Sequence, residues 1–347
     1  MLLELRMTMA EKTQKKAISK LGVGPLSEEI IEAAFRFSFE NKTSLMLIAS
    51  KNQIDWDGGY VNNWNTEEYI KFVGSMRQKY PDAKTYICRD HCGPGFNGNF
   101  DLEDVYHTIE DDVKHNFDLI HVDFCHYKGR YKQILNESRR IIEYIIKLNP
   151  QILIEIGTEE NSDGKIMDLK KAKKELDFFA GFFKPYFYAR KTGSLIKEVR
   201  QYGSFKKEYV IKLKKIADEY GIFIKEHNGD YLTAEEIKLR RGIVGALNVA
   251  PQYGVIQTKL TLQKCATYGI DYSSFLEISY KSNKWRKWLN KKNNLNDKYL
   301  CAIIAGHYNF TSSAYKKIYR QIQAHENFRE SIILEIMRNI KIYIDNL

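Results

Sequence analysis

The sequence contains no long hydrophobic run, and this absence argues against a membrane-spanning helix. None of its stretches reaches the roughly 18 consecutive apolar residues that a helix needs to cross a bilayer. The first 16 residues, MLLELRMTMAEKTQKK, contain an acid among few apolar residues and no small-residue cleavage site. We therefore do not interpret them as a signal peptide, and we expect no membrane partner.

Cysteine, proline and glycine are also scarce or scattered. The five cysteines are odd in number, and no pair has the spacing of a zinc finger. This usage is typical of a reduced, cytoplasmic protein. The 6 prolines and 21 glycines form no flexible linker or low-complexity tract among the 347 residues. The length suits one large barrel or two ordinary domains.

The net charge is +10, so acidic partners must be considered. The segment 281–298, KSNKWRKWLNKKNNLNDK, mixes basic residues with Trp285 and Trp288 and raises the possibility of RNA contact. No RNA-binding signature accompanies it, so nucleic acid is not favoured as a partner. A basic balance also suits phosphorylated substrates, because phosphate is bound by cationic or amide donors.

Short apolar runs alternate with longer helical patterns along the chain. Such alternation is typical of a parallel sheet with helical crossovers. The helical patterns include 27–41, with Ser27 as N-cap, 66–80, with Thr66 as N-cap, 131–148 and 167–183. The apolar runs lie at 16–20, the weakest, and at 44–50, 84–90, 119–125, 151–157, 186–190, 221–226 and 245–250.

Eight such units predict a (β/α)8 TIM barrel, an α/β fold. We expect the barrel to occupy residues 1–275 and a helical C-terminal extension to occupy 276–347. Within the extension, residues 312–344 form one long amphipathic stretch, which should pack against the barrel or a partner chain.

Polar residues follow nearly every predicted strand, at the end where barrel enzymes place their chemistry. His91 and His227 stand out as metal ligands, because imidazole with carboxylate is a common zinc donor set. We interpret His107, His115, His121 and His325 as hydrogen-bonded structural residues. The strand-end candidates are Asn52, Gln53, Gly59, Tyr60, Asp90, His91, Asp123, Glu155, Glu159, Arg190, Lys191, His227, Gly229, Asp230 and Asn248.

Five motifs occur in a fixed order. They are SKNQIDWDGGY (50–60), RDHCGPG (89–95), IHVDFCH (120–126), EIGTEENSDG (155–164) and KEHNGDYLT (225–233). On these motifs the chain resembles the accessory-subunit family of class II tagatose-bisphosphate aldolases and related ketose-phosphate 4-epimerases. It is more distantly similar to class II fructose-bisphosphate aldolases. The likeness covers roughly residues 17–275.

The resemblance implies a divalent metal, with zinc favoured, and a phosphorylated ketose as substrate. By that resemblance Asp90 matches the acid/base position, His91 and His227 match metal ligands, and Glu155 matches a metal-binding glutamate of the aldolases. Glu159 matches the glutamate of the family's IGTE segment. The remaining strand-end candidates would bind substrate, with Arg190, Lys191, Gly229 and Asn248 near its phosphate. Asn248 stands where the family has lysine.

Three functions remain open at this level. The first is a metal-dependent epimerase or aldolase, in which the metal is a Lewis acid and Asp90 takes the C4 hydroxyl proton as the C3–C4 bond breaks. The second is a metal-free, non-catalytic subunit that stabilises the catalytic chain of a class II tagatose-bisphosphate aldolase. The possible protein partners are such a catalytic aldolase subunit or further copies of this chain. The third, suggested by charge alone, is a nucleic-acid binder. The retained Asp90–His91 pair, Glu155, Glu159 and His227 favour the first.

Overall fold

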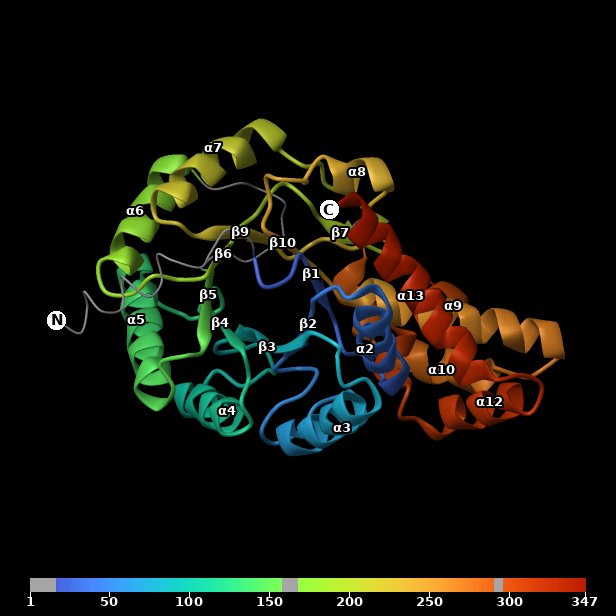
Figure 1. The fold of residues 1–347 in the computed structure, drawn as a ribbon. Coiled ribbons are helices and arrows are strands. Elements are labelled where there is room, and N and C mark those ends of the chain that lie inside the picture. The colour runs from blue at the N-terminus through green and yellow to red at the C-terminus, as the bar shows by residue number, and fades with distance from the viewer. Residues whose placement is uncertain (1–16, 158–167, 290–295) are drawn as a thin grey trace.

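The computed structural model describes residues 17–157, 168–289 and 296–347, and its centre is a closed barrel of parallel strands (Figure 1). The strands follow one another around the barrel in the order β1, β10, β9, β6, β5, β4, β3, β2. This eight-stranded barrel with surrounding helices confirms the predicted (β/α)8 fold.

The barrel strands lie close to the predicted runs, except at the start. The first strand begins at Leu21, after the expected 16–20 run, and of its three residues only Gly22 and Val23 pair with both neighbouring strands. A short antiparallel pair, β7 (Ile196–Lys197) and β8 (Arg200–Gln201), lies in the loop after β6. The barrel strands are β1 (Leu21–Val23), β2 (Leu45–Ser50), β3 (Thr85–Cys92), β4 (Leu119–Asp123), β5 (Leu153–Gly157), β6 (Phe187–Ala189), β9 (Phe223–Glu226) and β10 (Ala246–Val249).

Helices cover the outside of the barrel and begin at the side-chain caps that the sequence supplies. Ser27 caps the first of them, as predicted, by accepting a hydrogen bond from the Ile30 amide. The next helix begins one residue earlier than predicted, because Asn65 forms a capping box with Glu68, and Thr66 is the first helical residue. These helices are α2 (Glu28–Asn41), α3 (Thr66–Lys79), α4 (Leu102–Lys114), α5 (Tyr131–Leu148), α6 (Leu169–Ala180), α7 (Lys207–Glu219), α8 (Ala234–Lys238) and α9 (Pro251–Tyr268).

The C-terminal extension is helical and lies on one flank of the barrel, beside α2 and α9 (Figure 1). The predicted single stretch at 312–344 is two helices, α12 (Ser313–Gln323) and α13 (Phe328–Asn346), because the chain turns at residues 324–327. The other extension elements are α10 (Ser273–Lys281), η1 (Lys284–Trp288), α11 (Lys298–Ala305) and η2 (Gly306–Asn309). The boundary near residue 275 stays a prediction. No helix among the described residues is both long and apolar enough to cross a membrane.

The strand register determines which side chains face the barrel interior. In-register residues of parallel neighbours point to the same face, so Cys88, Leu119 and Leu153 begin one inward layer. Apolar side chains such as Met46, Ile48 and Phe187 fill the lower part of the interior. Two residues further along β4 and β5, the same face presents His121 and Glu155, which lie side by side. The interior therefore changes from apolar to ionisable toward the carboxyl ends of the strands.

Candidate metal centre

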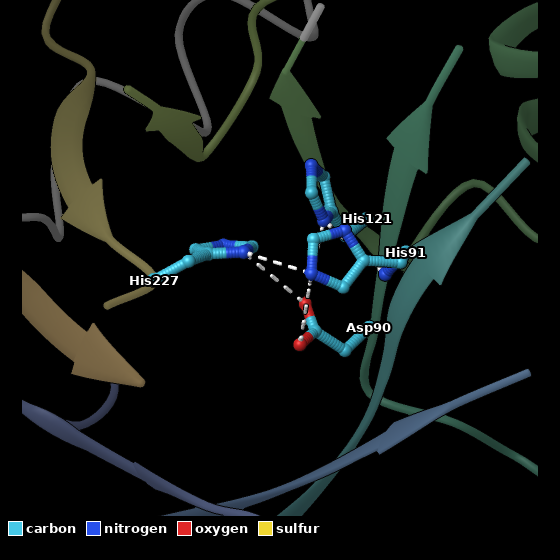
Figure 2. A group of neighbouring side chains, drawn as sticks. All are labelled: Asp90, His91, His121 and His227. Atoms are coloured by element: carbon cyan, nitrogen blue, oxygen red, sulfur yellow. Dashed lines mark hydrogen bonds and ion pairs between the residues drawn. The ribbon is translucent and has the colours of Figure 1, made fainter. Parts of the chain in front are cut away.

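Three histidines and one aspartate from three strand regions converge at the carboxyl end of the barrel (Figure 2). Each of Asp90, His91, His121 and His227 offers one ligand atom, and these atoms lie within 4.8 Å of one another. The Asp90 carboxylate lies 3.3 Å from His121 Nδ1 and 3.7 Å from both His91 Nε2 and His227 Nδ1. Residues that are far apart in sequence thus form one compact donor set.

Asp90 and His91 reach the same site although adjacent strand residues start toward opposite faces. Strand β3 is irregular between Arg89 and Cys92, and His91 has a left-handed backbone with φ of 51°. We expected the glycines of 93–95 to bend the chain. The bend already lies at His91, whereas Gly93 allows the end of β3 to approach β4, since a Cβ there would lie 1.6 Å from the Asp123 carbonyl oxygen.

Two carboxylates orient two of the histidines from behind. Asp123 Oδ2 lies 2.7 Å from His91 Nδ1, which leaves His91 Nε2 facing the centre of the group. Glu155 Oε1 lies 2.5 Å from His227 Nε2, and its other oxygen pairs with buried Lys225 at 2.5 Å. Histidines that bind metals commonly hold a carboxylate at their other nitrogen in this way.

The charges of the group are strongly coupled. Burial by itself would raise the pKa of Asp90, but the adjacent His91, His227 and His121 outweigh it and hold that pKa well below its usual value. Burial disfavours the His91 cation, yet Asp90 and Asp123 raise its pKa to about 9. For His227 burial prevails, and its pKa lies below the ordinary value. Asp90 is therefore ionised across the neutral range and His227 is uncharged.

His121 belongs to this group, so our interpretation of it as a structural residue outside the site missed its position. It faces the interior because it is two residues from inward-facing Leu119. Its Nε2 is buried and has no hydrogen-bond partner among the described residues. Gly157 leaves room for the ring, since a Cβ at that position would lie 2.9 Å from Nε2. The signal in the sequence was that His121 lies two residues before Asp123 on the same strand, so that both side chains point to the same face.

A cavity of about 280 Å³ opens beside the four residues. Its size is just below the usual range for small-molecule sites. Asp90, His91 and His227 line it. So do five of the residues predicted to bind substrate: Asn52, Gln53, Tyr60, Asp230 and Asn248.

The other predicted site residues, whether assigned to substrate, metal or catalysis, have different surroundings. Arg190 is buried and pairs with Glu175 of α6, outside the cavity lining. Asp123 supports His91, and Glu155 lies behind His227 instead of in the four-residue group. Lys191, Gly59 and Gly229 do not line the cavity either. Glu159 lies outside the described residues.

The extension supplies four lining residues that sequence reasoning did not assign to the site. They are Lys287, Trp288, His307 and Tyr308. The basic, aromatic segment that raised the question of RNA thus has another use, since Trp285 is buried in a core with Ile304, and its neighbours face the cavity. The mixture of lysine and tryptophan was the signal, but its spatial position was not apparent from sequence.

The donor chemistry of the four residues fits a divalent transition metal. Imidazole nitrogens with one carboxylate oxygen are typical zinc ligands, and ionised Asp90 would offset the charge of the ion. His121 presents Nδ1 to the group, 3.3 Å from the Asp90 carboxylate, and the carboxylates behind His91 and His227 are consistent with such a centre. The residues present therefore fit the metal that the resemblance implied.

Comparison with known proteins adds evidence about the fold. No protein-family model and no curated protein matches the sequence. Among solved structures, a probable tagatose 6 phosphate kinase from Sinorhizobium meliloti aligns with a TM-score of 0.76 at 15% identity, covering 95% of this chain and all (100%) of the other. The chain shares its fold with sugar enzymes.

Two further solved structures extend this likeness. The fructuronate-tagaturonate epimerase of Cohnella laeviribosi aligns with a TM-score of 0.70 at 11% identity, covering 94% of this chain and 81% of that one. A fructose-bisphosphate aldolase from Campylobacter jejuni aligns with a TM-score of 0.57 at 12% identity, covering 95% and 90%. At such identities the shared property is the fold.

Proposed function

We propose that the protein is a metal-dependent enzyme acting on a phosphorylated ketose, either epimerising it at C4 by retro-aldol and aldol steps or cleaving it as an aldolase. The observation that carries the proposal is the group of Asp90, His91, His121 and His227 beside a cavity at the carboxyl end of the barrel. The fold shared with an epimerase and an aldolase supports it.

In this proposal His91, His121 and His227 hold the ion, with zinc favoured. When bound, such an ion is a Lewis acid that polarises a ketose oxygen. Asp123 and Glu155 keep the His91 and His227 rings in the orientation that presents their inner nitrogens. The carboxylate of Glu155 was predicted as a ligand itself, and here we assign it this orienting role.

Asp90 is the proposed proton carrier. Its low pKa leaves it ionised and able to accept the proton of the C4 hydroxyl while the C3–C4 bond breaks. Return of the same proton to the C4 oxygen, after the aldehyde has turned over and C3 has added to its opposite face, yields the C4 epimer. Release of the aldehyde followed by transfer of a proton to C3 of the remaining enediolate completes cleavage instead. Asn52, Gln53, Tyr60 and Asn248 line the cavity and are the candidates for hydrogen bonds to the sugar hydroxyls. Glu159 stays a candidate second acid/base.

The test combines metal analysis with a screen of substrates. We expect about one equivalent of a divalent metal in the purified protein, and conversion of at least one ketose phosphate to its C4 epimer or to cleavage products. Chelation should abolish turnover and metal should restore it. His121→Ala should lose the metal, whereas His325→Ala, at an exposed histidine stacked on Tyr268, should retain it.

A metal-loaded protein without turnover that raises the activity of a separate aldolase chain would contradict the proposal and favour the non-catalytic subunit. A His121→Ala variant that binds metal as tightly as the parent would refute the ligand assignment alone.

A further inference from the structure

One wall of the cavity comes from the C-terminal extension instead of from the barrel loops. Lys287 and Trp288 of η1 and His307 and Tyr308 of η2 form this wall, which we call the extension wall. Two contacts fix it to the barrel. The Glu198 amide donates a 2.6 Å hydrogen bond to the Trp288 carbonyl, and the Tyr308 ring lies 4.5 Å from that of Tyr60.

The usual anion position of a TIM barrel is already filled in this chain. Barrels often bind phosphate with backbone amides at a helix N-terminus after the last two strands. Here the Asp230 carboxylate takes that position, because its Oδ1 accepts hydrogen bonds from the amides of Ala250 and Gln252 at 3.0 and 2.9 Å. Pro251 between them has no N–H to donate. An anionic ligand must therefore find its donors elsewhere in the cavity.

Among the described residues, Lys287 is the only lysine or arginine that lines the cavity. Its ammonium lies 5.0 Å from the Trp288 ring and 5.1 Å from the Tyr308 ring. These ring faces favour the cation without neutralising it. No carboxylate of the described residues forms an ion pair with Lys287, so its charge remains available to a ligand.

Two buried polar side chains in the cavity lining have no partner for their polar atoms. His307 and Asn248 are each 2% exposed. Among the described residues, His307 Nδ1 and both side-chain polar atoms of Asn248 lack a hydrogen bond. A buried polar atom without a partner is costly, and a ligand that supplies the partner recovers that cost. Both residues line the same cavity as Lys287.

We infer that the extension wall binds the anionic end of the ketose, a phosphate or a carboxylate, by an ion pair with Lys287 and a hydrogen bond with His307. This inference rests on the proposed function for the other end of the substrate, near the metal centre. It assigns recognition of the charged end to the extension, and it leaves the proton transfer to Asp90.

The test measures equilibrium binding, so it does not depend on turnover. Calorimetry on the metal-loaded protein would use a ketohexose 6-phosphate, a ketohexuronate and the neutral ketohexose. We expect the parent to bind one of the two anionic ketoses at least tenfold more tightly than the neutral one, and the preferred anion identifies the substrate class. Lys287→Met should lower that affinity by about tenfold to a hundredfold, the usual value of a charge-assisted hydrogen bond, and leave neutral ketose binding unchanged.

Lys284→Met is the matched control. Lys284 lies on the same short helix, 5.9 Å from the same Tyr308 ring, but does not line the cavity. It should retain the parent affinity. The inference is overturned if Lys287→Met binds the anionic ketose as tightly as the parent, if Lys284→Met loses as much, or if the parent binds neither anion. Anion binding that depends on Lys287 in a protein without turnover would support the wall and contradict the proposed reaction.

Discussion

Asp90 is the residue on which the proposed chemistry depends most. It is 8% exposed, lies among three imidazoles and stays ionised at neutral pH. A carboxylate in this position can be a proton carrier, or it can stabilise the cluster without taking part in the reaction. The two roles differ in what its removal changes.

Asp90→Asn should reduce turnover by roughly two to four powers of ten, the usual contribution of a general acid or base. The three imidazoles remain, so bound metal should persist at saturating concentration. Steady-state kinetics with elemental analysis of the same sample gives both values. A metal-loaded Asp90→Asn protein that converts substrate at the parent rate would show that Asp90 does not carry the proton.

His307 gives stability a pH dependence of known sign. Burial, with a smaller contribution from Lys287, lowers the pKa of His307 to about 3, against an ordinary value of 6.5. Between these values the unfolded chain binds the proton and the folded chain does not, so stability falls as the pH drops below 6.5.

Replacing His307 with phenylalanine removes this titration. Urea unfolding at pH 7 and pH 5 should show the parent losing about 2 kcal/mol more than His307→Phe between the two pH values, from about 1.4 kcal/mol per pH unit for one proton. Other titrating groups are common to both proteins and cancel in the comparison. Equal losses would mean that His307 is protonated in the folded state.

Part of the site could be read from the sequence at the level of single residues, and part could not. Asp90, His91 and His227 follow predicted strands, and the barrel brings such positions together. His121 was missed because a strand-end criterion does not detect a ligand inside a strand. Arg190 was assigned to substrate because its loop is near the site, yet its pairing with buried Glu175 depends on a helix orientation that sequence does not specify.

Strand β3 shows how one element determines the geometry of the centre. Its irregularity at His91 brings two consecutive side chains to one site, and Gly93 then permits close contact with β4. Neither the irregularity nor the contact has a periodic signature. Seven strands were predicted close to their observed positions, whereas β1 was displaced because three residues, one of them glycine, carry little β propensity.

Gly93→Ala should separate β3 from β4, since the added Cβ would overlap the Asp123 carbonyl oxygen. We expect a loss of at least about 2 kcal/mol in the free energy of unfolding, as for other overpacked sites, and weaker metal binding. Gly74→Ala is the control, because Gly74 lies within α3 and, apart from its chain neighbours and its own helix backbone, no atom of the described residues lies within 4 Å of the added Cβ. It should raise stability by up to about 1 kcal/mol. Unfolding of Gly93→Ala at the parent midpoint would contradict this account.

At the scale of the molecule, the extension and the barrel share one hydrophobic core. Ile332, Ile333, Ile336 and Ile340 of α13 are at most 2% exposed and belong to the same cluster as Leu21 and Leu47 of the barrel strands. Four buried isoleucines contribute about 2 kcal/mol each, which is comparable with the whole stability of a typical domain.

A chain ending at residue 275 should therefore fail to fold cooperatively, although the barrel strands all precede that position. We expect this shortened chain to be poorly soluble. In a urea titration monitored by far-UV circular dichroism it should show no sigmoidal transition, whereas the full chain should show one. A soluble 1–275 fragment with a cooperative transition would establish the barrel as an independent domain.

The extension wall also separates two properties along the gene. The proposed chemistry lies on Asp90, His91, His121 and His227, whereas the proposed selectivity for the charged end lies on Lys287 of η1 and His307 of η2. Substitutions in η1 and η2 can change which sugar is accepted while the metal-bearing strands stay as they are. A library of variants confined to η1 and η2 would therefore test new substrates while the catalytic residues stay unchanged. The same division would let natural variants change their substrate specificity without a change in the reaction.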